Sequence, residues 1–319
     1  MIVPVPRWPW LHGLRLTLRG HSGGGAFMPN QDIGFGCRAA GLLCSLTFVL
    51  LALVLVQSLP AEGSKAVSAM ANHTHRGGCD REGFRVVLDV GHTVDAPGAR
   101  SARGIPEYQF NLLLTEEIER ALLEAGFRRT FVLNTFGSAR TGLVQRVARA
   151  NALRADLFLS IHHDSVPQFL KEEWEYDGQL RNFSDRFKGH SIFVSMKNRQ
   201  HAASVTFARM LGHHLKVRGL QYTPHYSRGL MGPWRRTLVD VQAGVYRYDE
   251  LVVLRTTRMP AVLLEAGSIV NREEELLLAS TDRQTLIAAS VLSAVEGFCA
   301  LRPQRQARHR LPTSAAIVD

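Results

Sequence analysis

Three apolar segments of the chain each end at a side chain that can bind a metal ion or transfer a proton. Ligands of open α/β sheets bind beyond the carboxyl ends of the strands, so three such strands would bring these side chains to one edge. Two histidines and a carboxylate, with water in the remaining position, form a common zinc site in hydrolases. The segments are FRVVLDV, followed by Gly91-His92, LFLSI, followed by His162, and AVLL, followed by Glu265.

A fourth candidate, Glu107, lies in the connection that leaves the first of these segments. It follows Pro106, which is suited to open a helix because its fixed backbone angle is already helical. From the first turn of that helix, the Glu107 carboxylate could turn toward His92 and complete a ligand set. A structural explanation stays open for each residue. A glutamate at a helix start also interacts favourably with the helix dipole, and a lone buried histidine is more often structural than metal-binding.

Apolar periodicity places these residues in an alternating series of strands and helices. That order predicts an α/β domain of three layers, in which helices cover both faces of a mixed, mostly parallel sheet. Asn271 and Asp282 are the expected caps of the last two helices. The expected strands are 84–90, 130–134, 157–161, 191–196 and 261–264, and the expected helices are 106–126, 143–153, 202–217, 271–278 and 282–298.

Two stretches between these elements lack a clear period. Residues 218–250 are rich in Gly, Arg and Tyr and predict no regular element. Residues 166–189 form a long connection for an α/β domain, and long connections near active sites are often lids. We therefore hypothesise that this connection, with an amphipathic turn at 180–187, covers the candidate site.

The chain is basic, with 38 Lys+Arg against 28 Asp+Glu among its 319 residues. This balance favours an anionic neighbour such as a nucleic acid, a lipid surface or a carboxylate-rich polymer. Many arginines lie in the two flanks of the chain, so part of the excess belongs to tails rather than to a binding face. The sequence contains no helix-turn-helix or aromatic RNA-binding pattern, and we expect no nucleic-acid partner.

The segment 39–59 carries no charge and contains the apolar run LLCSLTFVLLALVLV. Its length suits either the core of a cleaved signal peptide or a membrane anchor, and both place the C-terminal part outside the cytoplasm. Arginines precede the segment and the next cation is Lys65, which indicates the same orientation. We expect an exported protein of the periplasm or cell envelope, held at the inner membrane if the segment is retained. The expected divisions are an unstructured region 1–38 that starts at Met1 or Met28, the export segment 39–61, a linker 62–83, a catalytic domain 84–300 and a basic flexible tail 301–319.

Two of the four cysteines, Cys79 and Cys299, lie outside the export region and flank the expected domain. The two ends of a domain are often close together, and exported proteins can oxidise paired cysteines. Two free thiols are the alternative. We predict a disulfide between them.

Five motifs occur in an order and spacing that resemble the catalytic domain of the zinc-dependent N-acetylmuramoyl-L-alanine amidases, the amidase type 3 family. Each fragment alone is weak, whereas the ordered set is specific. The likeness covers residues 84–298. The motifs are LDVGH at 88–92, Glu107, RVARAN at 146–151, SIHHDS at 160–165 and LLEAGSIVN at 263–271.

The resemblance implies that His92, Glu107 and His162 hold Zn²⁺. It implies that Glu265 is the catalytic carboxylate, which takes the proton of zinc-bound water. A six-stranded sheet is also implied, as is peptidoglycan as the substrate, cut between N-acetylmuramic acid and the L-alanine of the stem peptide. The chain departs from the family pattern at residues 93, 163–164 and 266–268, but no ligand is lost.

Several points stay open at the level of the sequence. His163-Asp164 could supply hydrogen bonds that orient a ligand. A zinc peptidase acting within the stem peptide and an inactive cell-wall-binding protein are the alternative functions. A regulatory or activating partner is not identifiable from the sequence. The remaining histidines are expected at the surface, namely His190, His201, His213, His214 and His225.

Overall fold

The computed structural model describes residues 78–302, which include the expected catalytic domain. The expected N-terminal region 1–38, the export segment 39–61, residues 62–77 of the linker and residues 303–319 of the tail lie outside the described residues. Within 78–302, none of the helices combines the length and the apolar character needed to cross a membrane.

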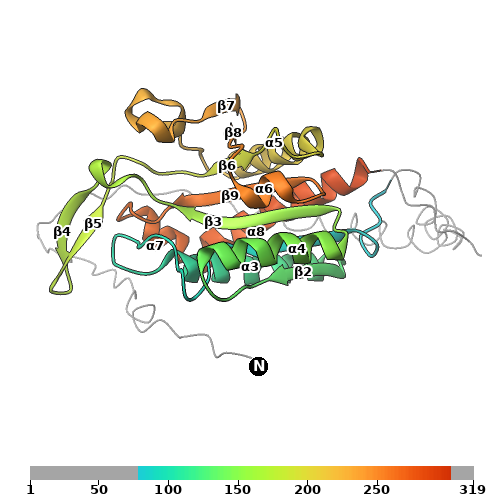
Figure 1. Cartoon of the computed structure of the whole chain (residues 1–319), viewed down its shortest axis with the longest axis horizontal. Coiled ribbons are helices and arrows are strands. Elements are labelled where there is room, and N and C mark those ends of the chain that lie inside the picture. Colours follow the sequence, from blue (N-terminus) through green and yellow to red (C-terminus); the bar gives the residue numbers. More distant parts are fainter. Residues whose placement is uncertain (1–77, 303–319) are drawn as a thin grey trace, which may run out of the picture. The chain divides into compact units, whose positions relative to one another are not determined.

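A mixed sheet of seven strands forms the centre of the domain, in the order β2-β1-β3-β9-β6-β8-β7 (Figure 1). Strands β2, β1, β3 and β9 are parallel, so their carboxyl ends lie at one edge, whereas β6 is antiparallel to β9. The mixed, mostly parallel sheet is therefore confirmed, with one strand more than expected. The strands are β1 (Arg85–Val90), β2 (Arg129–Leu133), β3 (Leu157–Asp164), β6 (Ser191–Val194), β7 (Thr237–Asp240), β8 (Val245–Arg247) and β9 (Ala261–Ser268).

Helices cover both faces of this sheet and complete the three predicted layers (Figure 1). Leu88, Leu159 and Leu264 point to one face, into a core shared with α3, α5 and α8. Their strand neighbours Phe158 and Leu263 point to the other face, into a core shared with α4 and α6. Alternation along each strand thus buries both faces. The helices are α3 (Glu107–Glu124), α4 (Ala139–Leu153), α5 (His201–Val217), α6 (Val252–Thr256), α7 (Glu274–Leu278) and α8 (Thr281–Ala300).

The long connection after β3 forms a β-hairpin rather than the amphipathic turn expected at 180–187. A short 3₁₀ helix, η1 (Gln168–Leu170), leads into β4 (Glu172–Tyr176) and β5 (Gln179–Phe183), which pair antiparallel. Asp177 and Gly178 both have positive φ, as a two-residue hairpin turn requires. That prediction was wrong because cross-strand pairing overrides the local helical pattern. The suggestion that the connection covers the site stays a hypothesis.

Helix starts agree with the expected caps in one case and differ in the other. Asn271 Oδ1 accepts a hydrogen bond from the Glu274 amide at 2.9 Å, so Asn271 caps the turn that leads into α7. Helix α8 is capped by Ser280, whose Oγ accepts from the Arg283 amide, and not by Asp282. Ser280 has an extended backbone that lets its side chain reach the first turn, whereas Asp282 already lies within the helix.

The predicted disulfide between Cys79 and Cys299 is confirmed. It joins the start of the described domain to the end of α8, and the two Cα atoms lie 5.0 Å apart across a sequence separation of 220 residues. The cross-link therefore closes nearly the whole domain into one loop.

Candidate metal centre and active site

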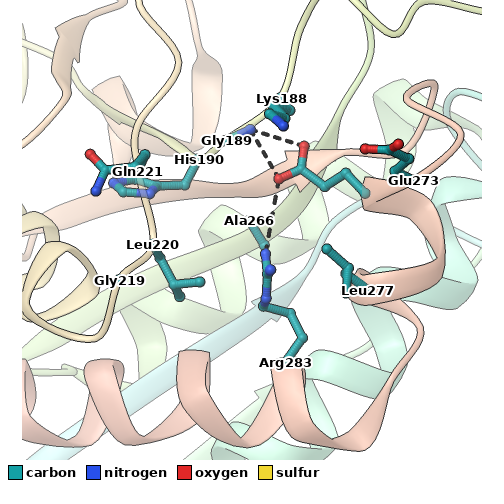
Figure 2. Close-up of a pocket in the computed structure, with 11 residues that line it drawn as sticks. Lys188, Gly189, His190, Gly219, Leu220, Gln221, Ala266, Glu273, Leu277 and Arg283 are labelled. Carbon is teal, nitrogen blue, oxygen red and sulfur yellow. Dashed lines mark hydrogen bonds and ion pairs between the residues drawn. The ribbon is translucent and has the colours of Figure 1, made fainter.

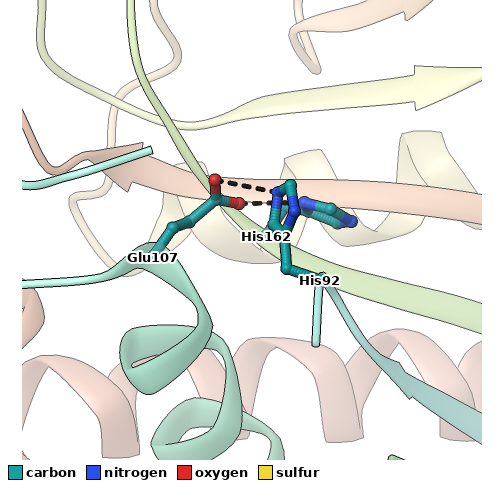
Figure 3. Close-up of side chains that lie close together, drawn as sticks. All are labelled: His92, Glu107 and His162. Carbon is teal, nitrogen blue, oxygen red and sulfur yellow. Dashed lines mark hydrogen bonds and ion pairs between the residues drawn. The ribbon is translucent and has the colours of Figure 1, made fainter. Parts of the chain in front are cut away.

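The structure brings His92, Glu107 and His162 together at the carboxyl edge of the sheet (Figure 3). One ligand atom from each residue lies within 4.8 Å of the other two. The Glu107 carboxylate lies 2.9 Å from His92 Nε2 and 2.9 Å from His162 Nδ1. The side chains of His92 and His162 are 30% and 14% exposed, which leaves water access to the cluster. Two imidazoles and one carboxylate with an open side fit the donor set of a hydrolytic zinc site.

Two glycines allow these side chains to approach one another closely. A Cβ atom on Gly98 would lie 2.5 Å from Glu107 Oε2, and the φ of Gly98 is +78°. A Cβ atom on Gly91 would lie 2.6 Å from the His162 ring. His92 itself has a φ of 67°, and a non-glycine residue in this region costs on the order of 1–3 kcal/mol. The backbone is therefore shaped around the three side chains.

Glu107 is buried, and its surroundings favour the ionised carboxylate. Burial alone would raise its pKa, but the hydrogen bonds from His162 and His92 outweigh burial and hold the pKa well below its usual range. The Ala99 amide also donates to Oε2 at 3.1 Å, and Asn111 Nδ2 donates to Oε1 at 3.3 Å. The carboxylate is thus kept in the anionic form that binds a divalent cation.

Asn111 holds Glu107 in position by a hydrogen bond, and His163 in turn holds Asn111. The Asn111 amide donates to Glu107 and to the Gly91 carbonyl, so its Oδ1 is left to accept from His163 Nδ1 at 2.8 Å. Burial lowers the pKa of His163 to about 3, so the ring is neutral. The suggestion that His163 orients a ligand fits this chain of contacts. Asn111 was missed, although its position four residues after Glu107 on α3 places both on one helix face.

A buried ion pair, which no local pattern in the sequence predicts, supports the backbone at His92. Arg146 Nε lies 3.3 Å from Asp89 Oδ1, and the two residues are 3% and 0% exposed. Arg146 also donates to the His92 carbonyl, and Ser160 Oγ donates to Asp89 at 2.7 Å. Burial raises the pKa of Asp89, although the Arg146 guanidinium lowers it. In the sequence, the only indication of this ion pair is that LDVGH contains an aspartate and RVARAN contains arginines.

Glu265 lies beside His162 because the two are register partners on the adjacent parallel strands β9 and β3. Partners of this kind point to the same face of the sheet, here the face covered by α4 and α6. Among the described residues, Glu265 Oε2 is buried without a hydrogen-bond partner. Burial raises the pKa of Glu265 well above its ordinary value, and the carboxylates of Asp164 and Glu107 raise it further. A carboxyl with a raised pKa holds a proton more firmly than an exposed one, which suits a group that must accept a proton and pass it on.

Asp164 and Tyr226 connect this edge of the sheet to the segment that follows α5. The Tyr226 hydroxyl donates to Asp164 Oδ1 at 2.6 Å. Burial raises the pKa of Asp164 to about 7, although this hydrogen bond opposes the shift. His225 is 2% exposed, with its ring centroid 5.1 Å from that of Phe187, so its expected surface position was wrong. The segment folds over the sheet and buries the ring, which a local pattern does not reveal.

His190 is also buried rather than exposed, because residues 221–223 pair with the chain beside it. Next to it is a hollow of about 210 Å³, which is lined by Ala266 and Arg283 among others (Figure 2). Ala266 follows Glu265 in β9 and so faces the opposite side of the sheet, which separates this hollow from the candidate active site. His201 and His213 are exposed as expected, and His214 is half-buried.

The Glu274 carboxylate ties the end of β9 to the chain before β6. It accepts from the Gly189 amide at 2.9 Å and from the Ser268 amide at 2.9 Å. These bonds hold the strand just beyond Glu265. Glu274 therefore belongs to the support of the edge on which the candidate residues meet.

Comparison with known proteins identifies the family of the domain. Residues 86–297 match the N-acetylmuramoyl-L-alanine amidase family. The chain is 26% identical over 268 residues to N-acetylmuramoyl-L-alanine amidase AmiC of Neisseria meningitidis. The match covers 74% of this chain and 58% of that relative. The matched region thus spans less than two thirds of that protein.

Solved structures share the fold. The N-acetylmuramyl-L-alanine amidase Ami1 of Mycobacterium smegmatis superposes with a TM-score of 0.52 at 22% identity, covering 69% of this chain and 98% of that one. The CwlD amidase of Clostridioides difficile, solved in complex with the GerS lipoprotein, gives a TM-score of 0.51 at 18% identity, covering 69% and 100%. With two thirds of the chain matched to the family and the same fold in these relatives, this chain belongs to the N-acetylmuramoyl-L-alanine amidase family.

Proposed function

We propose that the chain hydrolyses the amide bond between N-acetylmuramic acid and the L-alanine of the peptidoglycan stem peptide. Membership of the amidase family supports this reaction. The observation that carries the proposal is the meeting of His92, Glu107 and His162 beside Glu265 at one edge of the sheet. We assign the first three as the ligands of Zn²⁺ and Glu265 as the catalytic carboxylate.

The bound Zn²⁺ would supply Lewis acidity, which lowers the pKa of a coordinated water and stabilises negative charge on the carbonyl oxygen. Glu265 accepts the proton of the attacking water on Oε2, the atom that has no partner among the described residues. It then returns the proton to the nitrogen of L-alanine, so that the peptide leaves as a free amine. The raised pKa of Glu265 suits this exchange, because a carboxylate of ordinary pKa would release the proton to solvent too readily.

The surrounding residues keep the ligands in place during the reaction. Glu107 stays anionic because the His162 and His92 contacts outweigh its burial. Asn111 prevents rotation of that carboxylate, and Arg146 holds the carbonyl of His92. Asn111 and Arg146 therefore each act on a proposed ligand and not on the substrate.

Peptidoglycan as substrate requires a location outside the cytoplasm. The uncharged segment 39–59 supports export to the periplasm or cell envelope, with attachment to the inner membrane if the segment is retained. The complex of the related CwlD amidase with a lipoprotein supports a protein partner as a regulator here. We expect that nucleic acid is not a partner of this chain.

The test is mass spectrometry of purified peptidoglycan after digestion by the full-length protein with zinc. The expected products are intact glycan chains and stem peptides with a free N-terminal alanine. Glu265→Gln is the control and should release neither. Fragments cut inside the stem peptide would replace the proposal with a zinc peptidase. Binding to peptidoglycan without any product, in a zinc-loaded sample, would identify an inactive cell-wall-binding protein.

A further inference from the structure

Two large aromatic side chains lie exposed and in contact with each other on separate loops. Phe169 of η1 is 62% exposed, and Trp234, at the end of the 3₁₀ segment η3 (Gly229–Trp234), is 47% exposed. Their ring centroids lie 6.0 Å apart at an angle of 47°. We call this pair the aromatic ledge. Contiguous exposed apolar patches, especially those rimmed by polar residues, mark interaction or ligand-binding sites.

The loop that presents Trp234 is anchored, so the exposure of the ring is built into the fold. Met231 within it is 1% exposed. The Arg236 amide donates to the Tyr226 carbonyl at 2.7 Å, and Arg235 Nε donates to the Ser227 carbonyl at 3.0 Å. Below the ledge, leucines of both loops pack on a small apolar cluster. That cluster contains Val166, Phe187 and Val270, against which Leu170 and Leu230 pack.

The aromatic ledge belongs to the edge of the sheet that carries the candidate active site. Phe169 follows β3, the strand of His162. The loop of Trp234 is joined to the same strand end by the hydrogen bond from Tyr226 to Asp164. In Figure 1, the gold segment between α5 and β7, which includes η3, lies toward the carboxyl ends of β3 and β9.

The loop that presents Trp234 is positively charged, whereas the hairpin that follows Phe169 begins with the exposed carboxylates Glu172 and Glu173. Arg228 and Arg235 are exposed on the Trp234 loop, and residues 201–239 contain no aspartate or glutamate. Exposed aromatic rings beside exposed arginines suit a ligand that has an apolar ring face and carboxylate substituents.

We propose that the aromatic ledge is a glycan subsite, on which a sugar ring of the peptidoglycan strand packs its C–H face against Trp234 and Phe169. Arg228 and Arg235 contact carboxylates of the attached stem peptides. This inference rests on the proposed function, because it names where the polymer lies when its amide bond reaches Glu265. The ledge binds substrate and takes no part in the chemical step.

The experiment measures binding of the full-length protein to insoluble peptidoglycan by co-sedimentation, and to soluble β-1,4-linked N-acetylglucosamine tetramer by calorimetry. Truncation of a buried aromatic contact typically costs enough to weaken binding by about tenfold. Trp234→Ala should therefore raise Kd for both ligands by about that factor, whereas Trp234→Phe should retain most of the affinity. The control is Leu286→Ala, which truncates an exposed apolar residue of α8 outside the ledge.

Arg228→Gln separates the contact with carboxylates from the contact with the sugar ring. It should weaken binding of peptidoglycan and leave binding of the neutral tetramer unchanged. In the hydrolysis assay, Trp234→Ala should raise KM about tenfold with kcat and zinc content unchanged. Unchanged Kd for both ligands in Trp234→Ala overturns the ledge proposal even if hydrolysis is observed. A wild-type protein that releases no peptide refutes the proposed function, and the binding measurements still decide the ledge. A change in oligomeric state with unchanged glycan binding would instead identify a protein contact.

Discussion

Replacing Arg146 by methionine should destabilise the domain and loosen the metal centre together. The substitution keeps much of the side-chain volume but removes the guanidinium that pairs with Asp89, which is fully buried. Asp89 would keep only the Ser160 hydroxyl as a partner. The carbonyl of His92 would lose its donor as well.

The magnitude follows from the burial of both charges. Removing one partner of a buried ion pair costs about 3–5 kcal/mol, because the other charge stays desolvated. For a domain of this size, each kcal/mol lowers Tm by roughly 2–4 °C, so Tm should fall by about 6–20 °C. Loss of a residue that orients a metal ligand weakens metal binding by about 10–100-fold, and we expect zinc affinity to fall in this range.

Chemical unfolding of the zinc-free protein measures the stability term alone, and competition with a chelator measures zinc affinity. Arg149→Met, an exposed arginine on the same helix, is the control and should change neither. The double variant Asp89→Asn/Arg146→Met should regain most of the stability but not the zinc affinity. Burial already raises the pKa of Asp89, so the deficit of Arg146→Met should shrink as pH falls and the carboxyl becomes neutral. Equal stability of Arg146→Met and wild type would refute this reasoning.

Three further predictions test the catalytic roles, a buried histidine and the disulfide. Glu265→Gln should retain zinc and lose about 10²–10⁴-fold in turnover, whereas Glu107→Gln should lose zinc, and the opposite pattern in elemental analysis would exchange the two roles. Burial lowers the pKa of His190 to about 4, so wild type should lose up to about 3 kcal/mol as pH falls from 6.5 to 4, and an unchanged pH profile in His190→Met would contradict this. Replacing Cys79 and Cys299 by serine should lower the free energy of unfolding by about 2–5 kcal/mol, measured by urea denaturation of the oxidised wild type and the variant.

Local patterns in the sequence were sufficient for the main strands and for the candidate residues at their ends. Strands β1, β3 and β9 are short apolar runs, and parallel strands must deliver the residues after them to one edge. Hence His92, His162 and Glu265 could be placed together before the structure was known. The disulfide was predictable because Cys79 and Cys299 flank the domain, and the two ends of a domain are often close together.

Other features depend on contacts between distant parts of the chain, which no local period encodes. Strands β8 and β7 lie at one end of the sheet and in a stretch without clear alternation. They form only through pairing between strands, β8 with β6 and β7 with β8. The hairpin of β4 and β5 overrides a helical pattern for the same reason. Burial of His190 is imposed by the segment that pairs beside it.

The sequence by itself determined the family, the order of the candidate ligands and the type of chemistry, because these depend on residue identity and on strand ends. Only the tertiary structure decided what supports them. Arg146 on α4 reaches Asp89 and the His92 carbonyl across a sequence separation of more than fifty residues, and Trp234 meets Phe169 from a different loop. Such pairs arise from packing of helices and loops onto the sheet, and packing depends on the whole set of side chains rather than on any one segment.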